Sequence, residues 1–225
     1  MKQLPSVTPR ERTWGWVWYG FELLALPSLL MLSGKSLGLS NLQVNFLYYF
    51  LNFAFVFLIF RRFLLENLAR AGECLRRVLE VSALGYAALE AGSFAVGRLI
   101  GVFFPEFANV NDASLAAMAS QGPVMLFVST VVLVPLAEEV LFRSLIFGEM
   151  LPRSRWGAYL ISALAFCAVH VTGYVGLYPA GLLALCFLQY LPAGLILALI
   201  YEKTGTIFAP VVIHTAVNLT AMMLL

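Results

Sequence analysis

The feature that most constrains this fold is a series of apolar runs, each long enough to cross roughly 30 Å of membrane hydrocarbon as a helix. Hydrophobic residues make up 61% of the 225 residues and charged residues only 12%, whereas about a quarter of the residues of a soluble domain are charged. The sequence therefore predicts an all-α, polytopic membrane helix bundle. Its seven expected spans lie near 14–33, 44–60, 79–104, 124–150, 157–175, 180–202 and 206–225.

Two segments between these runs are too polar to cross a membrane. The stretch 61–78 is rich in arginine and glutamate, and we expect it to form an amphipathic helix on the membrane surface. The stretch 105–122 contains prolines, asparagines and an aspartate and is expected to be a loop. We see no soluble domain, so residues 1–121 are interpreted as N-terminal transmembrane helices with one cytoplasmic amphipathic segment.

The basic residues predict the orientation of the bundle. With seven spans and a cytoplasmic N-terminus, Lys35 is the one basic loop residue that faces outwards. The cytoplasmic set has eleven members: Lys2, Arg10, Arg12, Arg61, Arg62, Arg70, Arg76, Arg77, Arg153, Arg155 and Lys203. This asymmetry follows the positive-inside rule and predicts an integral protein of a bacterial plasma membrane, with the bilayer as its surroundings. The net charge of +2 is too small to indicate nucleic-acid binding.

Three ionisable residues interrupt the fourth apolar run, within Val134–Arg143. Each charge at the centre of a membrane helix costs about 2.5–3.5 kcal/mol unless it is paired or wetted. Glu139 and Arg143 are four residues apart on a helix and can neutralise each other. Glu138 lies about 100° around the helix from Glu139, so it can face a cavity and act as a general base. The alternative is a structural charge cluster that holds the helices in register.

Both histidines of the chain also lie in apolar runs. His170 could be a core residue, whereas His214 shares a helix face with Asn218, which could stabilise an oxyanion or form an interhelical hydrogen bond. At about 1.5 Å per residue, Glu138, His170 and Asn218 lie roughly 18–20 Å from the cytoplasmic ends of their helices. His214 lies at roughly 12 Å. A common layer predicts a shared water-filled cavity that opens towards the cytoplasm.

Three motifs, in this order along the chain, resemble those of the CAAX protease and bacteriocin-processing (CPBP, or Abi) membrane proteins: Glu138-Glu139-x-x-x-Arg143, Phe166-x-x-x-His170 and His214-x-x-x-Asn218. Members of that family are intramembrane glutamate-dependent endopeptidases. The stretch from Gly194 to His214 also resembles the joint between the family's last two helices. The resemblance covers roughly 122–225, and it implies that this part is the catalytic core.

The resemblance also implies roles for single residues. Glu138 would activate water with His170 as its partner, while His214 and Asn218 would bind the scissile carbonyl and stabilise the oxyanion. The supporting residues would be Glu139, Arg143 and Phe166. No cofactor or metal is expected. The expected substrate is a hydrophobic or lipidated peptide or protein, because such chains partition to the depth of the site.

Three other functions are compatible with the same residues. A zinc protease could use Glu138, His170 and His214 as ligands with water as the fourth, although the sequence has no pair of histidines four residues apart. A proton-coupled transporter could use buried glutamate and histidine as relays, although two matching halves with broken helices are not evident. The third is a non-catalytic membrane scaffold or chaperone.

Three further charged residues within the apolar runs receive no catalytic role. Glu90 and Arg98 share one predicted span, eight residues apart, and we interpret them as a structural pair. Glu22 in the first span is unassigned.

Overall fold

The computed structural model describes residues 4–224, and this part of the chain is helical with no β-strand. Lys2 and Leu225, which the sequence analysis places in the cytoplasmic N-terminal segment and the last span, lie outside the described residues. The N-terminal helices are α1 (Pro9–Leu24), α2 (Leu26–Leu37), α3 (Asn41–Ile59), α4 (Arg61–Glu73), α5 (Leu75–Phe103) and α6 (Val110–Ala119). The C-terminal elements are α7 (Pro123–Phe127), η1 (Val128–Leu133), α8 (Val134–Glu139), η2 (Val140–Phe147), α9 (Gly148–Met150), α10 (Arg155–Thr172), α11 (Ala180–Thr204) and α12 (Phe208–Leu224).

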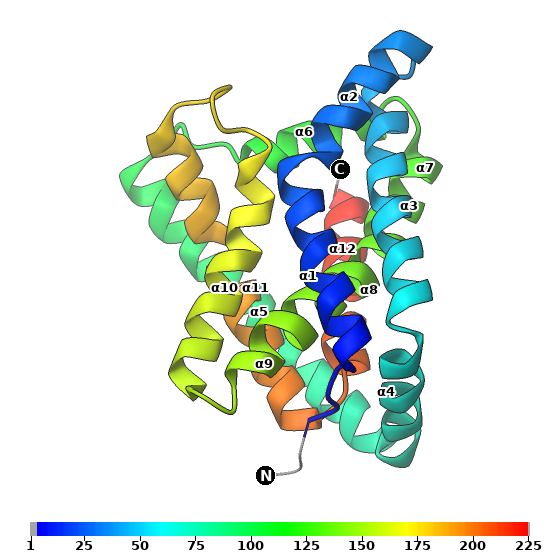
Figure 1. Ribbon diagram of the computed structural model, residues 1–225. Coiled ribbons are helices and arrows are strands. Elements are labelled where there is room, and N and C mark those ends of the chain that lie inside the picture. The colour runs from blue at the N-terminus through cyan, green and yellow to red at the C-terminus, as the bar shows by residue number, and fades with distance from the viewer. Residues whose placement is uncertain (1–3, 225) are drawn as a thin grey trace.

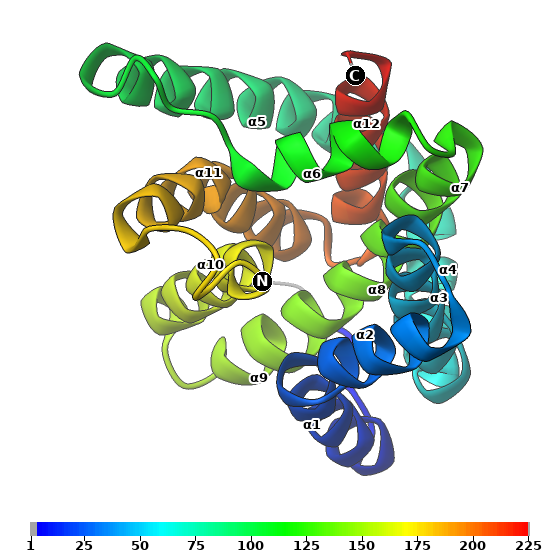
Figure 2. The same ribbon diagram turned by 90° about the horizontal axis from the view of Figure 1, so that it is seen from above.

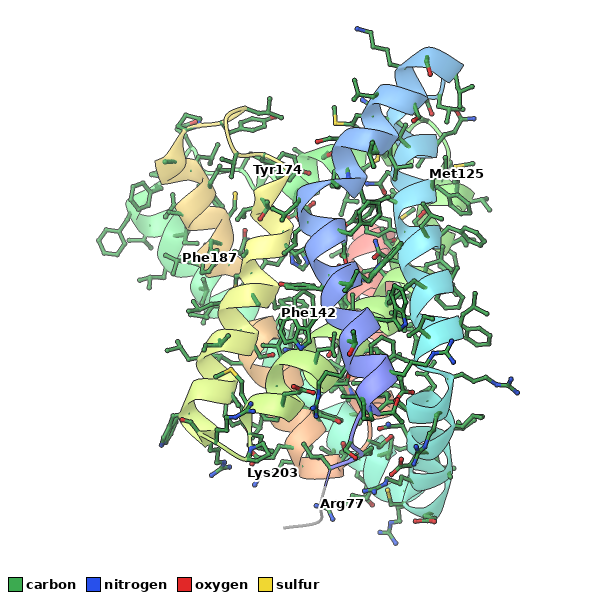
Figure 3. All side chains as sticks on the ribbon, in the orientation of Figure 1. Arg77, Met125, Phe142, Tyr174, Phe187 and Lys203 are labelled. Carbon is green, nitrogen blue, oxygen red and sulfur yellow. The ribbon has the colours of Figure 1, made fainter. Side chains whose placement is uncertain are left out.

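The helices form a bundle with α8 near its middle (Figures 1 and 2). The start of α1, α4 and α9 lie at one end, and α2, α6 and α7 lie at the opposite end (Figure 1). Figure 3 shows Arg77 and Lys203 at the first end and Met125 and Tyr174 at the other. We call the first end the basic end. The loop charges that predicted the orientation thus gather on one side of the bundle.

Several helices are long and apolar enough to cross a membrane. They are α3, α5, the continuous segment Pro123–Met150 and α11, and the bent pair α1–α2 makes five if it counts as one span. α10 is not among these candidates, and α12 is a shorter apolar helix of 17 residues. The polytopic helical membrane bundle is therefore confirmed, while the number of seven spans stays a prediction.

The first predicted span is bent by 54° between α1 and α2. Pro27 follows the break and lacks the N–H that would bond the carbonyl of Leu23 one turn earlier. The apolar run is therefore continuous in sequence, but the helix is not continuous in space.

The predicted surface helix 61–78 is two helices in the structure. α4 ends at Glu73, and the long helix α5 begins at Leu75. α4 also packs against the bundle, because Phe63 and Asn67 are fully buried. The Oδ1 atom of Asn67 accepts a hydrogen bond from the N–H of Ile207 at 2.8 Å, which joins α4 to the turn before α12.

The prediction of a loop over 105–122 is wrong for α6. Asn109 begins this helix as its cap, because its side chain accepts a hydrogen bond from the N–H of Asn111 at 2.9 Å. The residues Ser114–Ala119 that follow are mostly good helix formers. The polar composition of the segment reflects the cap and its neighbours, not an unstructured connection.

The core around the motif-bearing helices is closely packed. Phe142 on η2 and Phe166 on α10 are buried with their ring centroids 5.4 Å apart, and Figure 3 shows Phe142 in the middle of the bundle. A Cβ atom at Gly194 on α11 would lie 2.9 Å from the Cα atom of Ala163 on α10. Glycine at 194 therefore allows α10 and α11 to approach each other beside the η2 segment.

Candidate active site

Glu139 and Arg143 form a fully buried ion pair. The Nε atom of Arg143 donates to Oε2 of Glu139 at 2.8 Å, and both side chains are 0% exposed. The Nη1 atom of Arg143 also donates to Ser162 Oγ at 2.8 Å and to the carbonyl of Gly194 at 3.3 Å. The guanidinium carbon lies 5.2 Å from the centroid of the Phe166 ring. The spacing of four residues predicted this pair, and the structure shows that it also fixes α10 and α11 against η2.

His214 lies between the two adjacent glutamates. Its Nδ1 atom is 3.1 Å from Oε1 of Glu139, and its Nε2 atom is 4.0 Å from Oε2 of Glu138. An ionised carboxylate only accepts hydrogen bonds, so the contact with Glu139 assigns the proton to Nδ1. This contact orients the ring so that Nε2 faces Glu138. The 4.0 Å separation is too long for a direct hydrogen bond and short enough for one water to touch both groups.

Glu138 and Glu139 have different surroundings although they are adjacent in sequence. The Glu138 side chain is 16% exposed, and that of Glu139 is fully buried. The Oε2 atom of Glu138 has no hydrogen-bond partner among the described residues. Both oxygens of Glu139, in contrast, are occupied by Arg143 and His214. One carboxylate is held in place, and the other keeps a free acceptor.

Within residues 4–224, His170 forms no hydrogen bond or ion pair with Glu138. Its Nδ1 atom lies 2.8 Å from the carbonyl oxygen of Phe166, and its ring stacks on Tyr190 with centroids 4.2 Å apart. The Phe166 ring contacts both imidazoles, with centroid distances of 4.7 Å to His170 and 5.8 Å to His214. The two predicted histidines are thus linked through Phe166, which was expected as a supporting residue.

Polar residues of α6 lie beside Tyr190, which stacks on His170. Tyr190, which stacks on His170, accepts a hydrogen bond from the side-chain amide of Asn111 at 3.0 Å. Burial raises the pKa of the Asp112 carboxyl above its usual range, and the charge of His170 and a hydrogen bond with Tyr190 oppose this rise. Sequence reasoning missed these residues because it interpreted their segment as a loop.

Asn218 donates a hydrogen bond to the carbonyl oxygen of Thr130 at 2.7 Å. Asn218 lies one helical turn beyond His214 on α12, as predicted, and Thr130 lies in η1. This hydrogen bond joins α12 to η1, which is continuous with the helix α8 that carries Glu138. This bond uses one N–H of the side-chain amide, and the second N–H of the same group can donate to a reacting carbonyl oxygen.

Two π-helical segments, η1 and η2, flank α8 and its glutamates. At the end of η1 the N–H of Val134 bonds the carbonyl of Ser129, and at the end of η2 the N–H of Gly148 bonds that of Arg143, each five residues back. Pro135 has no N–H for the carbonyl of Val131, which favours a departure from the α pattern at this point. Such insertions are frequent at functional sites. The position of Pro135 was the available sequence signal for this irregularity.

The N-terminal helices also contribute to the surroundings of Glu138. Tyr19 on α1 contacts Phe142 of η2, with ring centroids 6.1 Å apart, and α3 packs against α8, which carries Glu138. Glu22, unassigned from sequence, is buried and accepts a hydrogen bond from Tyr48 at 2.9 Å. These residues carry no motif, so sequence reasoning had no signal for them.

The sequence also suggested two other groupings, a zinc site and a pair formed by Glu90 and Arg98. Residues 4–224 contain no group of three or more His, Cys, Asp or Glu side chains arranged to hold a metal ion. The three residues considered above as zinc ligands, Glu138, His170 and His214, do not form such a group in this part of the chain. Glu90 and Arg98 form no ion pair within the described part of the chain, and Arg98 is exposed.

A known protein family matches the part of the chain that carries the three motifs. Residues 120–220 match the family model described as type II CAAX prenyl endopeptidase Rce1-like. The UPF0177 protein YxdF of Lactococcus lactis subsp. lactis (strain IL1403) is 35% identical over 88 residues, which cover 39% of this chain and 43% of that protein. The chain therefore matches less than half the length of this curated relative. No solved structure matches the chain.

These findings confirm the resemblance to the CPBP proteins, and the family model covers the part of the chain that carries all three motifs. The family match ends two residues after Asn218. It begins within the turn before α7 and therefore leaves α1 to α6 unmatched.

Proposed function

We propose that this chain is an intramembrane endopeptidase of the CAAX protease type in which Glu138 activates the attacking water. The observation that carries the proposal is the difference between the two adjacent glutamates beside His214. Glu139 is fixed by Arg143 and His214, whereas Oε2 of Glu138 has no hydrogen-bond partner in residues 4–224 and lies 4.0 Å from Nε2 of His214. The match of residues 120–220 to the endopeptidase family supports this reading.

In the proposed reaction, a water between Glu138 and His214 gives a proton to Glu138 and attacks the scissile carbonyl carbon. The carbonyl oxygen becomes negative as the tetrahedral intermediate forms. The amide of Asn218 and the imidazolium form of His214, which carries a proton on both ring nitrogens, donate hydrogen bonds to it. Glu138 then returns the proton to the leaving amine, and the products are a new carboxyl group and a new amino group.

The surrounding residues would act by holding this geometry. The Glu139–Arg143 pair fixes the orientation of His214, because the Nδ1–H of the ring donates to Glu139 and leaves Nε2 directed at Glu138. His170 belongs to the proposal as the second imidazole, in contact with Phe166 on one side and Tyr190 on the other. No step in this scheme requires a metal or a cofactor.

The proposed substrate is a hydrophobic or lipidated peptide or protein. Glu138 lies on a helix segment with a mean hydropathy of 2.0 that is long enough to cross a membrane. A substrate that partitions into the bilayer would reach this depth without the cost of desolvating a polar chain. We place the protein in a bacterial plasma membrane with the basic end and the opening of the site towards the cytoplasm, as the loop charges indicate.

The test is a peptide-cleavage assay with purified protein in detergent, run in oxygen-18 water. We expect the wild-type protein to introduce one labelled oxygen into the new carboxyl terminus of a hydrophobic peptide. Glu138→Gln should slow the cleavage at least about 100-fold, because glutamine keeps the shape and removes the base. The matched control is Glu80→Gln, at an exposed ion pair with Arg76, which should cleave at the wild-type rate. A wild-type rate in Glu138→Gln would refute the proposed role of Glu138.

A further inference from the structure

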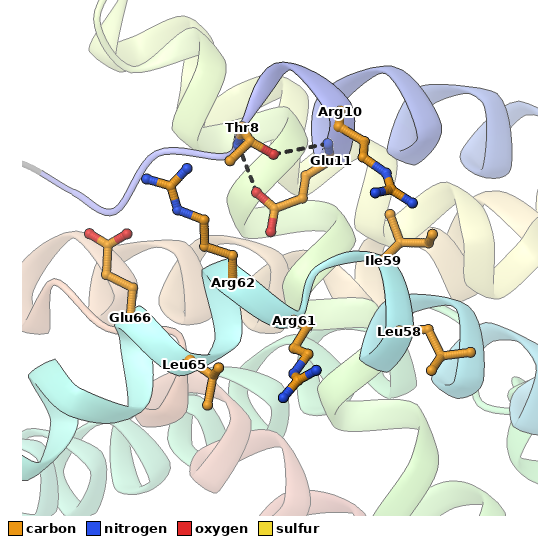
Figure 4. A pocket seen from close by; sticks show the side chains of 9 residues that line it. All are labelled: Thr8, Arg10, Glu11, Leu58, Ile59, Arg61, Arg62, Leu65 and Glu66. Atoms are coloured by element: carbon orange, nitrogen blue, oxygen red, sulfur yellow. Dashed lines mark hydrogen bonds between the residues drawn. The ribbon is translucent and has the colours of Figure 1, made fainter.

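A cavity lies at the basic end, between the starts of α1 and α4 and the end of α3. Its volume is about 770 Å³. Its lining residues, drawn in Figure 4, are Thr8, Arg10, Glu11, Leu58, Ile59, Arg61, Arg62, Leu65 and Glu66. We call it the arginine pocket. None of its lining residues belongs to the three motifs of the candidate active site.

The two carboxylates of the arginine pocket are already engaged. Glu11 accepts hydrogen bonds from the N–H of Thr8 at 2.7 Å and from the N–H of Phe63 at 3.0 Å. Glu66 pairs with Arg70 at 3.1 Å. The three arginines of the pocket, in contrast, have no ion pair with a carboxylate in residues 4–224: Arg10, Arg61 and Arg62. Within the described residues, the pocket therefore presents three guanidinium groups that form no ion pair.

The buried carboxylate of Glu11 joins the two helices that carry these arginines. Glu11 is 3% exposed, and its carboxylate joins the first turn of α1 to the first turn of α4. Figure 4 shows Arg10 projecting from α1 near Ile59, and Arg61 and Arg62 projecting from the start of α4. Arginines from two separate helices thus line one cavity, and Figure 4 shows their side chains extending in different directions from it.

The remaining wall of the arginine pocket is apolar. Leu58 and Leu65 are 71% and 55% exposed, and Ile59 lies beside them. Leu58 and Ile59 end α3, which is long and apolar enough to cross a membrane. The guanidinium groups therefore lie at the level where a membrane helix ends, which is where the headgroups of a bilayer are found. An apolar chain bound along the end of α3 would extend away from the guanidinium groups.

We propose that the arginine pocket binds an anionic phospholipid, with the headgroup phosphate on the arginines and an acyl chain along Leu58 and Leu65. Arginine suits this role because its planar fork makes two parallel hydrogen bonds to phosphate oxygens. Basic pockets at the ends of membrane helices are known to bind acidic headgroups. This inference is independent of the proposed proteolysis, because no residue is shared between the two sites.

The experiment measures bound phosphatidylglycerol on purified protein in neutral detergent by native mass spectrometry. We expect phosphatidylglycerol to bind more tightly than phosphatidylcholine. The affinity should fall about fivefold for each arginine replaced by glutamine and roughly 100-fold for Arg10→Gln, Arg61→Gln and Arg62→Gln together. The matched control replaces three arginines at the same end of the bundle and has the same change in net charge: Arg76→Gln, Arg77→Gln and Arg153→Gln. This control should retain the wild-type affinity.

Three results would overturn the proposal. One is equal binding by the pocket variant and the wild-type protein. Another is an equal loss in the control variant, which would indicate a general attraction of the basic end. The third is full competition by glycerol phosphate, which would indicate a site for a free phosphate and not for a lipid. If the triple variant does not fold, Arg61→Gln alone decides, because its side chain is exposed and its effect of about fivefold is still measurable.

Discussion

Arg143 in the middle of the bundle and the arginine pocket at the basic end place the same side chain in opposite surroundings. Arg143 is 0% exposed and contacts a carboxylate, a hydroxyl, a backbone carbonyl and an aromatic ring. The three pocket arginines are exposed and have no carboxylate partner in the described chain. A buried guanidinium needs partners from its own chain, because removal from water is costly. An exposed one keeps its charge available for a ligand.

The same contrast separates the two glutamates of the motif. Glu139 shares a buried charge cluster with Arg143 and His214, and each of its two oxygens contacts one of these side chains. Glu138 is partly exposed and has an oxygen without a hydrogen bond in residues 4–224. In a membrane bundle, the complete pairing of one charge therefore indicates a structural role, and an incomplete pairing beside it indicates where chemistry can occur.

The largest expected effect on stability comes from the buried arginine. Arg143→Ala leaves Glu139 as an uncompensated buried charge, so the free energy of unfolding should fall by about 3–5 kcal/mol. Arg61→Ala, in the arginine pocket, should change it by no more than about 0.5 kcal/mol, as is usual for exposed positions. Thermal unfolding of both variants in the same detergent measures the difference. Equal melting temperatures would remove the distinction between the two regions.

A smaller effect should distinguish the two histidines. His214→Gln removes the imidazole that faces Glu138 and is held by Glu139, so the cleavage rate should fall by about 100-fold or more. His170→Gln should lower it less, because the recorded contacts of His170 go to Phe166 and Tyr190. The comparison is made at saturating peptide. A larger loss in His170→Gln would mean that His170 and not His214 assists Glu138.

No effect is expected from metal removal. The proposed base is a carboxylate that acts on free water, so the cleavage rate should survive prolonged treatment with o-phenanthroline or EDTA and removal of the chelator. Elemental analysis of the active protein should find zinc well below one atom per chain. A loss that added zinc restores would instead favour a zinc site with Glu138, His170 and His214 as ligands.

The sequence predicted the features that depend on spacing and on the apolar pattern. The helical membrane bundle and the Glu139–Arg143 pair follow from run lengths and from a separation of four residues, and both are present. The sequence did not predict α6, because a cap residue such as Asn109 has the same composition as a loop. It also gave no sign of the bridging position of His214, which depends on how α12 packs against α8.

The contribution of the N-terminal helices could not be predicted for a different reason. Tyr48 and Glu22 carry no motif, and their proximity to the site arises from the packing of α1 and α3 around α8. Contacts between residues far apart in the chain leave no periodic pattern in a single sequence. The π-helical segments are also set by local hydrogen bonding, and only Pro135 gave an indication of them.

The central claim is that adjacent glutamates have separate roles, and one paired measurement tests it most directly. Cleavage rate and melting temperature are determined on the same preparations of Glu138→Gln and Glu139→Gln. We expect Glu138→Gln to lose cleavage by at least about 100-fold while its melting temperature stays near that of the wild type. Glu139→Gln should lower the melting temperature clearly, because it leaves Arg143 buried without its counter-charge. Wild-type cleavage by Glu138→Gln, or a loss of stability as large as that of Glu139→Gln, would contradict the account.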